Sequence, residues 1–337
     1  MATLLKHTVK PSGGDFDTLS AAAAHLLSAH SDLVSQDQYA EIEISGDWSG
    51  TPDTAMTLFD WSVAPITDAT HYIHVYTDSA NRARSAWDTS KYILGVSNDY
   101  VMKIYDNCVR IDGLQLSSPA QDADFRCGIF TAWQTGNNAD IRLSNLLIKG
   151  PNSATYRFYG INLGDPLGTG KVYIWNTVVF GMSTGDSDAA IVDGSSTAGS
   201  KYIYNCVALG GVQGLLAASA GWVIKNSYFK GDTGYAIDGV SNCTLTSVAT
   251  SDETGTIDNV AYDANNFKNV GAGTEDFDLA GTGSALYHAG SDTSGDSAPL
   301  NFGTDIHGDN YYSQRSIGVD EVIASGGATI EICVGEE

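Results

Sequence analysis

Three aspartates close together in a glycine-rich stretch are the residues of this chain whose type and spacing could do chemistry. Asp186, Asp188 and Asp193 lie within the segment GDSDAAIVDG. Hydrolysis of a glycosidic bond uses two carboxyl groups held about 5–9.5 Å apart, and such a loop could supply them. The same loop could bind a cation through its carboxylate oxygens, or it could simply be acidic, since the chain carries 40 acidic and 17 basic residues. We therefore predict no catalytic residue and keep these three aspartates as the alternative.

Other residue types do not form a recognisable reactive pattern. The seven histidines show neither the Ser-His-Asp order of a triad nor an HExxH zinc motif; they are His7, His25, His30, His71, His74, His288 and His307. The five cysteines include no CxxC pair, so a zinc site is not indicated and buried free thiols are expected. We predict no metal and no cofactor.

Aromatic side chains are the remaining chemical lead. Trp175 follows the aliphatic Ile174, so in a strand the two side chains point to opposite faces, and Trp175 is expected outside. Tyr173, Tyr202 and Tyr204 occupy comparable positions. An outer face rich in aromatic rings suits contact with another protein, and secondly stacking on a sugar.

A recurring phrase predicts the strands that position these side chains. It reads VRIDGLQLSS at residues 109–118, IRLSNLLIKG at 141–150 and VYIWNTVVFG at 172–181, and three later copies follow. Aligned on one small residue, the copies are 21 to 32 residues apart, which fits turns of a parallel β-helix with loop insertions. The residue two places earlier is aliphatic in every copy: Ile111, Leu143, Ile174, Ile203, Ile224 and Leu245. The residues four places earlier are mostly apolar, and Lys201 is the charged exception.

The small residue itself predicts a bend. After it the inward phase shifts by one residue, which a single residue in the left-handed αL conformation would produce, and Gly and Asn tolerate that conformation best. Stacked Asn amides could also hydrogen-bond from coil to coil. The alternative, a sandwich of hairpins, would need turn signals at both ends of each strand. We name this set the bend column: Gly113, Asn145, Asn176, Asn205, Asn226 and Ser247.

Further segments complete the predicted architecture. Residues 16–29 predict a helix with Leu19, Ala23, Leu26 and Leu27 on one stripe, suited to cover the open end of the stack. The predicted organisation is an N-terminal strand and capping helix over 1–38, a β-helix over 39–322 and a C-terminal strand or tail over 323–337. Strands are expected at Tyr39–Ser45, Tyr72–Thr77, Tyr92–Val96 and Tyr100–Tyr105, and at 127–132, 159–164, 189–194, 214–219 and 235–240 as another side of the coil.

With these features the chain resembles the right-handed parallel β-helix, or pectin-lyase-like, superfamily from about residue 39 to 320. GTEDFDLAGTGSALYHAG (273–290) and DIHGDNYYSQRSIGVDEV (305–322) resemble its closing coils. TVKPSGGDFDTLSAAAAHL (8–26) resembles the start of β-helix proteins encoded by tailed bacteriophages. The resemblance implies an all-β, single-stranded solenoid that often forms homotrimers. Of the polygalacturonase-like motifs, NTD, DD and RIK are missing, and HG occurs only at His307-Gly308.

Charge and leader signals limit the partners. The net charge of −23 repels nucleic acid and anionic membranes. The first residues show no secretion signal, so we expect synthesis in a host cytoplasm. The favoured hypothesis is a structural virion protein, an external capsid-decoration or other surface protein of a tailed bacteriophage that contacts other virion proteins. The alternative is a tailspike, lyase or hydrolase that binds or degrades a cell-surface glycan.

Overall fold

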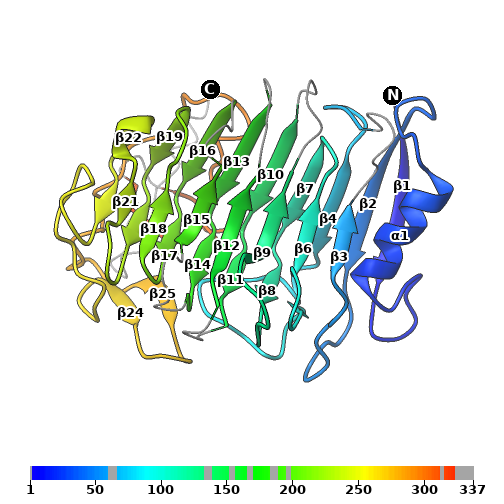
Figure 1. Ribbon diagram of the computed structural model, residues 1–337, viewed down its shortest axis with the longest axis horizontal. Helices are drawn as coiled ribbons and strands as arrows, with labels where there is room; N and C mark the ends of the chain where they lie inside the picture. The colour runs from blue at the N-terminus through cyan, green and yellow to red at the C-terminus, as the bar shows by residue number, and fades with distance from the viewer. Residues whose placement is uncertain are drawn as a thin grey trace, which may run out of the picture.

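Short parallel strands follow one another along the molecule and form three sheets (Figure 1). The computed structural model describes residues 2–59, 67–132, 139–151, 156–164, 170–182, 189–194, 199–311 and 315–322. Sheet A contains β1 (Thr3–Val9), β2 (Gln38–Ile44), β4 (Ile73–Thr77), β7 (Val109–Asp112), β10 (Asp140–Ser144), β13 (Lys171–Trp175), β16 (Ser200–Tyr204), β19 (Trp222–Lys225) and β22 (Cys243–Thr246).

The other two sheets supply the remaining sides of each coil. Sheet B contains β5 (Ile93–Gly95), β8 (Gln115–Ser117), β11 (Leu147–Lys149), β14 (Val178–Phe180), β17 (Val207–Leu209), β20 (Tyr228–Lys230) and β23 (Ala249–Thr250). Sheet C contains β3 (Thr57–Phe59), β6 (Met102–Ile104), β9 (Arg126–Thr131), β12 (Phe158–Leu163), β15 (Ala189–Asp193), β18 (Gln213–Leu216) and β21 (Ile237–Asp238). The predicted parallel β-helix is confirmed.

The inward aliphatic column lies in register across sheet A. Ile111 pairs with Leu143, Leu143 with Ile174, Ile174 with Ile203, and the pairing continues through Ile224. These five side chains are fully buried. Burial of one aliphatic side chain contributes about 1.5–3 kcal/mol, so the column is a main source of the stability of the stack.

The bend column has the predicted backbone conformation. All six residues have φ between +49° and +82°. The amide of Asn176 donates to Asn145 Oδ1 at 3.2 Å, and that of Asn226 donates to Asn205 Oδ1 at 3.4 Å. A Cβ atom on Gly113 would lie 2.5 Å from Thr77 Oγ1, which explains why this member of the column is a glycine.

Helix α1 (Leu19–Ala29) packs on the first coils and contributes to their core. It begins at Leu19 because the side chain of Thr18 accepts a hydrogen bond from the Ala21 amide at 3.2 Å. Leu19, Ala23 and Leu26 are buried as predicted, but Leu27 is 39% exposed, so the buried stripe is narrower than expected.

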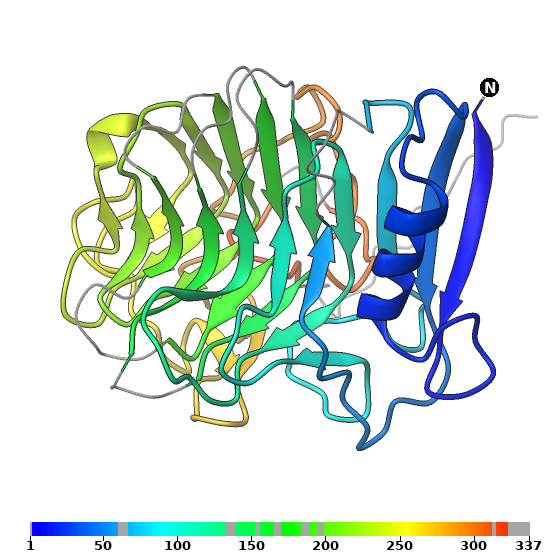
Figure 2. The same cartoon turned by 45° about the vertical axis from the view of Figure 1, so that its right-hand side comes forward.

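The C-terminal part differs from the predicted closing coils. Stacked strands end at Thr250, and β24 (Phe267–Asn269) and β25 (Asp276–Leu279) form an antiparallel pair instead of another coil. We call residues 257–311 and 315–322 the return segment. It packs Phe267, Phe277, Leu286, Ile306 and Val319 on the outer face of sheet B, and Figure 2 shows it in yellow and orange behind the coils.

Both ends of the β-helix differ from the predicted boundaries. β1 pairs in parallel with β2 and is thus part of the solenoid, although it lies within the predicted cap. The β-helix spans residues 3–250 rather than 39–322. The predicted tail, 323–337, lies outside the described residues. No helix in the described ranges is long and apolar enough to cross a bilayer.

Candidate functional site

The structure removes Asp193 from the alternative catalytic cluster. Its side chain is fully buried inside the coil, where its Oδ2 lies 2.7 Å from Lys201 Nζ, and that lysine is also fully buried. The amide of Ala218 and the indole N–H of Trp222 donate to the same carboxylate, at 2.7 and 3.1 Å. Asp193 therefore compensates a buried charge and faces no solvent. Asp186 and Asp188 lie outside the described residues.

The predicted aromatic positions on sheet A do point outward. The rings of Tyr173 and Tyr202 stack with centroids 5.0 Å apart. The return segment covers part of this surface, with Leu300 and Phe302 packed against it. Tyr173 is only 8% exposed and Tyr204 only 5%. Trp175 and Tyr202 keep partial exposure, so the surface open to a partner is smaller than the sequence predicts.

The bend column has a second role that the sequence does not reveal. The amide of Asn176 also donates to the Thr304 carbonyl at 3.0 Å, and the hydroxyl of Tyr311 donates to Asn176 Oδ1 at 3.1 Å. Asn226 exchanges two hydrogen bonds with Ser291, at 2.7 and 2.8 Å. The amides that join one coil to the next therefore also attach the return segment to the coils.

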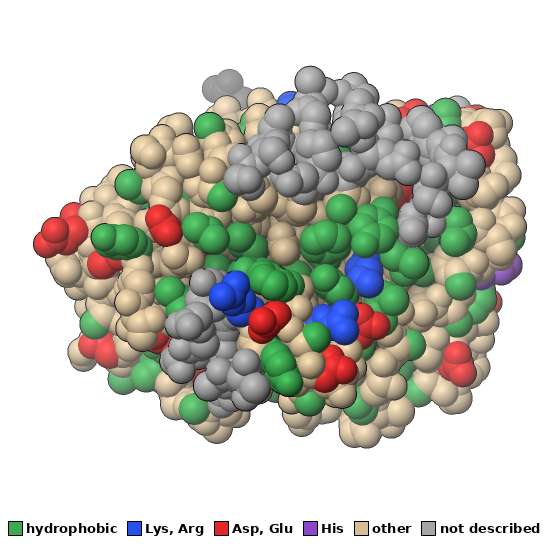
Figure 3. Space-filling view, in the orientation of Figure 1, with side chains coloured by type: hydrophobic (Ala, Val, Ile, Leu, Met, Phe, Trp, Pro, Cys, Tyr) green, Lys and Arg blue, Asp and Glu red, His purple; other side chains and the backbone are tan. Residues whose placement is uncertain are grey.

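Another candidate surface lies on the outer face of sheet C, which the sequence did not single out, and one of its rings, Tyr159, is only 8% exposed. We call this surface the aromatic–basic band. Its rings and cations lie side by side, with Lys103 Nζ 4.3 Å from the centroid of Tyr100 and Arg157 Cζ 5.3 Å from that of Phe125. Figure 3 shows hydrophobic side chains gathered across this face with Lys and Arg beside them. The band comprises Tyr100, Lys103, Phe125, Arg126, Phe130, Arg157, Tyr159 and Leu216.

Phe125 is the most unusual residue of the band. Its φ is +67°, in the left-handed region where a bulky side chain is costly, and its side chain is 49% exposed. The Phe125 amide donates to the Arg157 carbonyl at 3.0 Å, and the Arg157 amide donates to Asp124 Oδ1 at 2.9 Å. Two coils thus hold an exposed ring in a strained conformation, which is typical of functional positions.

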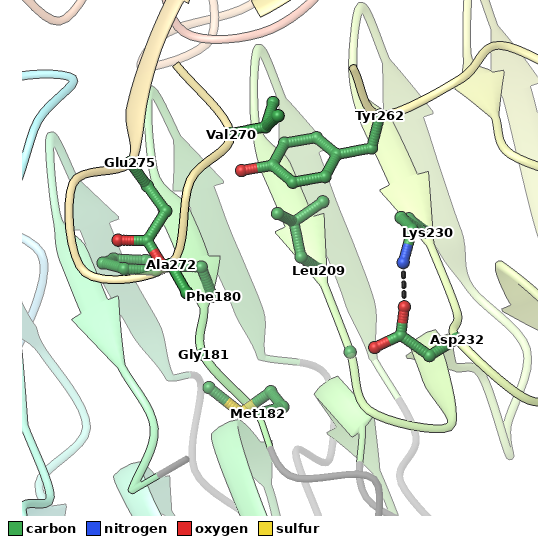
Figure 4. A pocket seen from close by; sticks show the side chains of 11 residues that line it. Phe180, Gly181, Met182, Leu209, Lys230, Asp232, Tyr262, Val270, Ala272 and Glu275 are labelled. Atoms are coloured by element: carbon green, nitrogen blue, oxygen red, sulfur yellow. Dashed lines mark hydrogen bonds and ion pairs between the residues drawn. The ribbon is translucent and has the colours of Figure 1, made fainter. Parts of the chain in front are cut away.

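A pocket of about 230 Å³ lies between sheet B and the return segment (Figure 4). Phe180, Leu209 and Lys230 line it from the sheet, and Tyr262 and Glu275 line it from the return segment. The hydroxyl of Tyr262 and Oε2 of Glu275 are buried and have no hydrogen-bond partner among the described residues. Apolar walls with a few unpaired polar groups are the usual composition of a small-molecule site.

Burial sets the charge states in this pocket. It raises the pKa of Tyr262, and the nearby Glu275 carboxylate raises it further, so this hydroxyl remains protonated and can donate a hydrogen bond. Burial also lowers the pKa of Lys230, which forms an ion pair with Asp232. The pocket therefore offers a hydroxyl donor, a carboxylate acceptor and an ammonium group to a polar ligand.

A second pocket, also about 230 Å³, lies where the return segment meets the loop after β4. In it His307 Nε2 lies 2.6 Å from Asp278 Oδ1 and 3.8 Å from Asp320 Oδ1. Burial and repulsion from Asp278 raise the pKa of Asp320 to about 7. Burial acts the same way on Asp278, but hydrogen bonds from His307 and Ser85 outweigh it and lower the Asp278 pKa to about 2. Perturbed acids in a cleft make it a candidate reactive site.

The distribution of possible metal ligands completes the description. Among the described residues, two groups bring three such side chains together. One is Asp278 and His307, which line the second pocket, with Asp320 behind them, and the other is His7, His25 and His30 near α1. Cys108, Cys127 and Cys206 are buried free thiols, as expected, whereas Cys243 is free but partly exposed and Cys333 lies outside the described residues. The scan against protein-family models and the search of curated proteins gave no match.

Proposed function

We propose that this chain is a structural surface protein of a tailed bacteriophage particle, acting through protein–protein contacts made by the aromatic–basic band. The observation that carries the proposal is Phe125, an exposed ring held at φ +67°. Large aromatic and Arg side chains dominate binding energy at protein interfaces. The free energy of this backbone strain is offset when a partner covers the ring and removes it from water.

The charge of the chain favours a second copy as one such partner. Lys103, Arg126 and Arg157 are three of 17 basic residues in a chain with a net charge of −23. An acidic neighbour complements such a band, and the rest of this chain is acidic. A homotrimer, which the resemblance implies, would bury the band between copies. The proposal that the particle is a bacteriophage rests on the resemblance of residues 8–26 to the start of phage-encoded β-helix proteins.

Substitution of Phe125 by glycine tests the proposal. Glycine removes the ring and relieves the positive φ, so the variant should melt at the same temperature as the wild type or higher. We expect the wild-type chain to assemble at micromolar concentration in mass photometry, and Phe125→Gly to weaken assembly roughly 30-fold, as loss of about 2 kcal/mol implies.

The matched control is Tyr235→Gly, which removes an exposed ring from outside the band. It should leave assembly unchanged. A wild-type chain that stays monomeric and does not bind purified particles would overturn the proposal. So would a Phe125→Gly variant that assembles normally.

Glycan binding or cleavage is the second candidate, and the pocket of Figure 4 favours it. The Tyr262 hydroxyl and the Glu275 carboxylate are unpaired hydrogen-bonding groups of the kind that sugar hydroxyls satisfy. A screen of bacterial polysaccharides for binding and for reducing-end release tests it. Tyr262→Phe and Glu275→Gln should abolish any signal, whereas Tyr235→Phe should not.

A further inference from the structure

Three imidazole rings meet at the N-terminal end of the stack, between the first strand and the helix. His7 lies on β1, His25 lies near the end of α1, and His30 is the C-cap residue of that helix. One ring nitrogen of each lies within 4.8 Å of those of the other two. In the sequence these histidines look unrelated, and only the packing of α1 beside β1 brings them together.

The ring geometry is close to that of histidines on a shared metal ion. The centroids of His7 and His25 are 5.1 Å apart at an interplanar angle of 85°, and those of His25 and His30 are 6.0 Å apart at 69°. Two imidazoles on one tetrahedral zinc ion, at Zn–N distances of about 2.0–2.1 Å, have centroids roughly 5.2 Å apart. Small side-chain rotations would therefore bring all three rings into coordination distance.

The state of His7 gives an independent reason to expect a ligand. Its Nε2 is buried and has no hydrogen-bond partner among the described residues. An unpaired buried nitrogen costs free energy, and a metal ion would satisfy it. Burial lowers the pKa of His7, and the neighbouring His25 lowers it further. The ring is therefore neutral at pH 7, and its nitrogen can bind a metal.

The surroundings favour a cation as well. His30 caps the C-terminal end of α1, where the helix dipole places partial negative charge. Asp15 is close enough for its charge to act on His7, and its carboxylate is fixed by the amide and the hydroxyl of Thr8, at 2.7 and 3.0 Å. Negative charge is thus held near His7.

We propose that His7, His25 and His30 form a binding site for a divalent transition-metal ion such as Zn²⁺, which joins α1 to β1. Imidazole ligands suit Zn²⁺, Cu²⁺ and Ni²⁺ and disfavour Mg²⁺ and Ca²⁺. Three protein ligands leave a fourth position for water or for a group from a neighbouring molecule. The ion would fix the helix that covers the first coils, and this conclusion does not depend on the function proposed above.

Titration of the untagged full-length chain with Zn²⁺ in a calorimeter tests the site, together with the visible absorption of a Co²⁺-loaded sample. We expect one equivalent bound, a tetrahedral Co²⁺ spectrum, and slower hydrogen exchange in α1 and β1 when Zn²⁺ is present. His7→Gln and His25→Gln should each weaken binding at least about tenfold, which is about 1.4 kcal/mol. Binding should also weaken as the pH falls, because protons compete with the metal ion for the imidazole nitrogens.

His71→Gln is the matched control, because His71 is a partly exposed histidine with carboxylate partners outside the cluster. It should bind Zn²⁺ as the wild type does. Melting without metal shows whether each variant is folded. No saturable binding up to about 1 mM Zn²⁺ in the wild type, a range that reaches the weak end of specific binding, would refute the proposal. Binding that survives in the triple glutamine variant but disappears in Asp278→Asn would also refute it, because the metal would then lie in the second pocket.

Discussion

Replacing Lys201 by methionine should destabilise the coil strongly. Lys201 lies in a second inward column of sheet A, two residues before the aliphatic one and in register with Val172 and Trp222. Its ammonium group donates to Asp193 and to Ser219 Oγ, both at 2.7 Å. Methionine fills a similar volume but leaves the Asp193 carboxylate buried without its counter-charge. Removal of one partner of a buried ion pair costs about 3–5 kcal/mol.

That free energy gives a measurable shift in melting temperature. A chain of 337 residues unfolds with an entropy of roughly 0.7 kcal/mol per kelvin. If the coils melt together, Lys201→Met should therefore lower Tm by about 4–7 °C. Differential scanning calorimetry gives the transition.

The double variant Lys201→Met with Asp193→Asn separates charge from packing. An asparagine Oδ1 can still accept the hydrogen bond from the Ala218 amide, and no charge remains in the core, but the Trp222 indole N–H loses its acceptor, Oδ2. We expect the double variant to recover most of the loss and to lie within about 1–2 kcal/mol of the wild type. A single variant that loses less than about 1 kcal/mol, or a double variant as unstable as the single one, would refute the reasoning, since the charge would then not be the cause.

Two further predictions concern the attachment of the return segment. Asn176→Ala should lose about 2–4 kcal/mol, because alanine is strained at φ +49° and the hydrogen bonds to Asn145 and Thr304 are lost, whereas Asn176→Gly should lose about 1–2 kcal/mol less; thermal melting gives the order, and equal losses would contradict it. The pKa of Asp320, raised to about 7, means that folding takes up a proton between about pH 4 and 7, so stability should fall as the pH rises through this range. Because the pKa of Asp278 is lowered, its contribution to stability is lost as the pH falls below about 4. Because the pKa of His307 is raised, its contribution is present at low pH and is lost as the pH rises through the pKa of the folded state. Hydrogen exchange of residues 305–311 and 315–322 across pH 4–8 should show the tightest attachment near pH 4–5, and Asp320→Asn should reduce the loss toward neutral pH to the part that His307 contributes.

The repeat was predictable because its determinants are local. An aliphatic residue two places before an Asn or Gly fixes which side chains face inward and where the backbone bends, and no distant contact is needed. Lys201 was also visible as the one charged residue in a column that is otherwise apolar or cysteine. A buried lysine requires a partner, but the sequence alone could not name Asp193, because the two residues lie on different sheets and only the folded coil brings them together.

The return segment was not predictable, because its contacts join residues far apart in the chain. Tyr311 bonds to Asn176 and the Gly318 amide bonds to the Asn226 carbonyl at 2.9 Å. A strand pattern such as EDFDLAG predicts local extension equally for a stacked coil and for a hairpin on the outside. The choice depends on the apolar outer face of sheet B, where Tyr228 and Phe180 need cover.

That coverage directs attention to sheet C as the face for a partner. The return segment packs on the outer face of sheet B and over part of sheet A. The hydrophobic cluster on the outer face of sheet C contains residues of that sheet and its loops, and none from the described return segment. Among the described residues, the return segment covers parts of sheets A and B, so we expect a partner to bind at sheet C. The strained Phe125 lies on that third face, so its ring is the side chain whose loss should separate binding from folding.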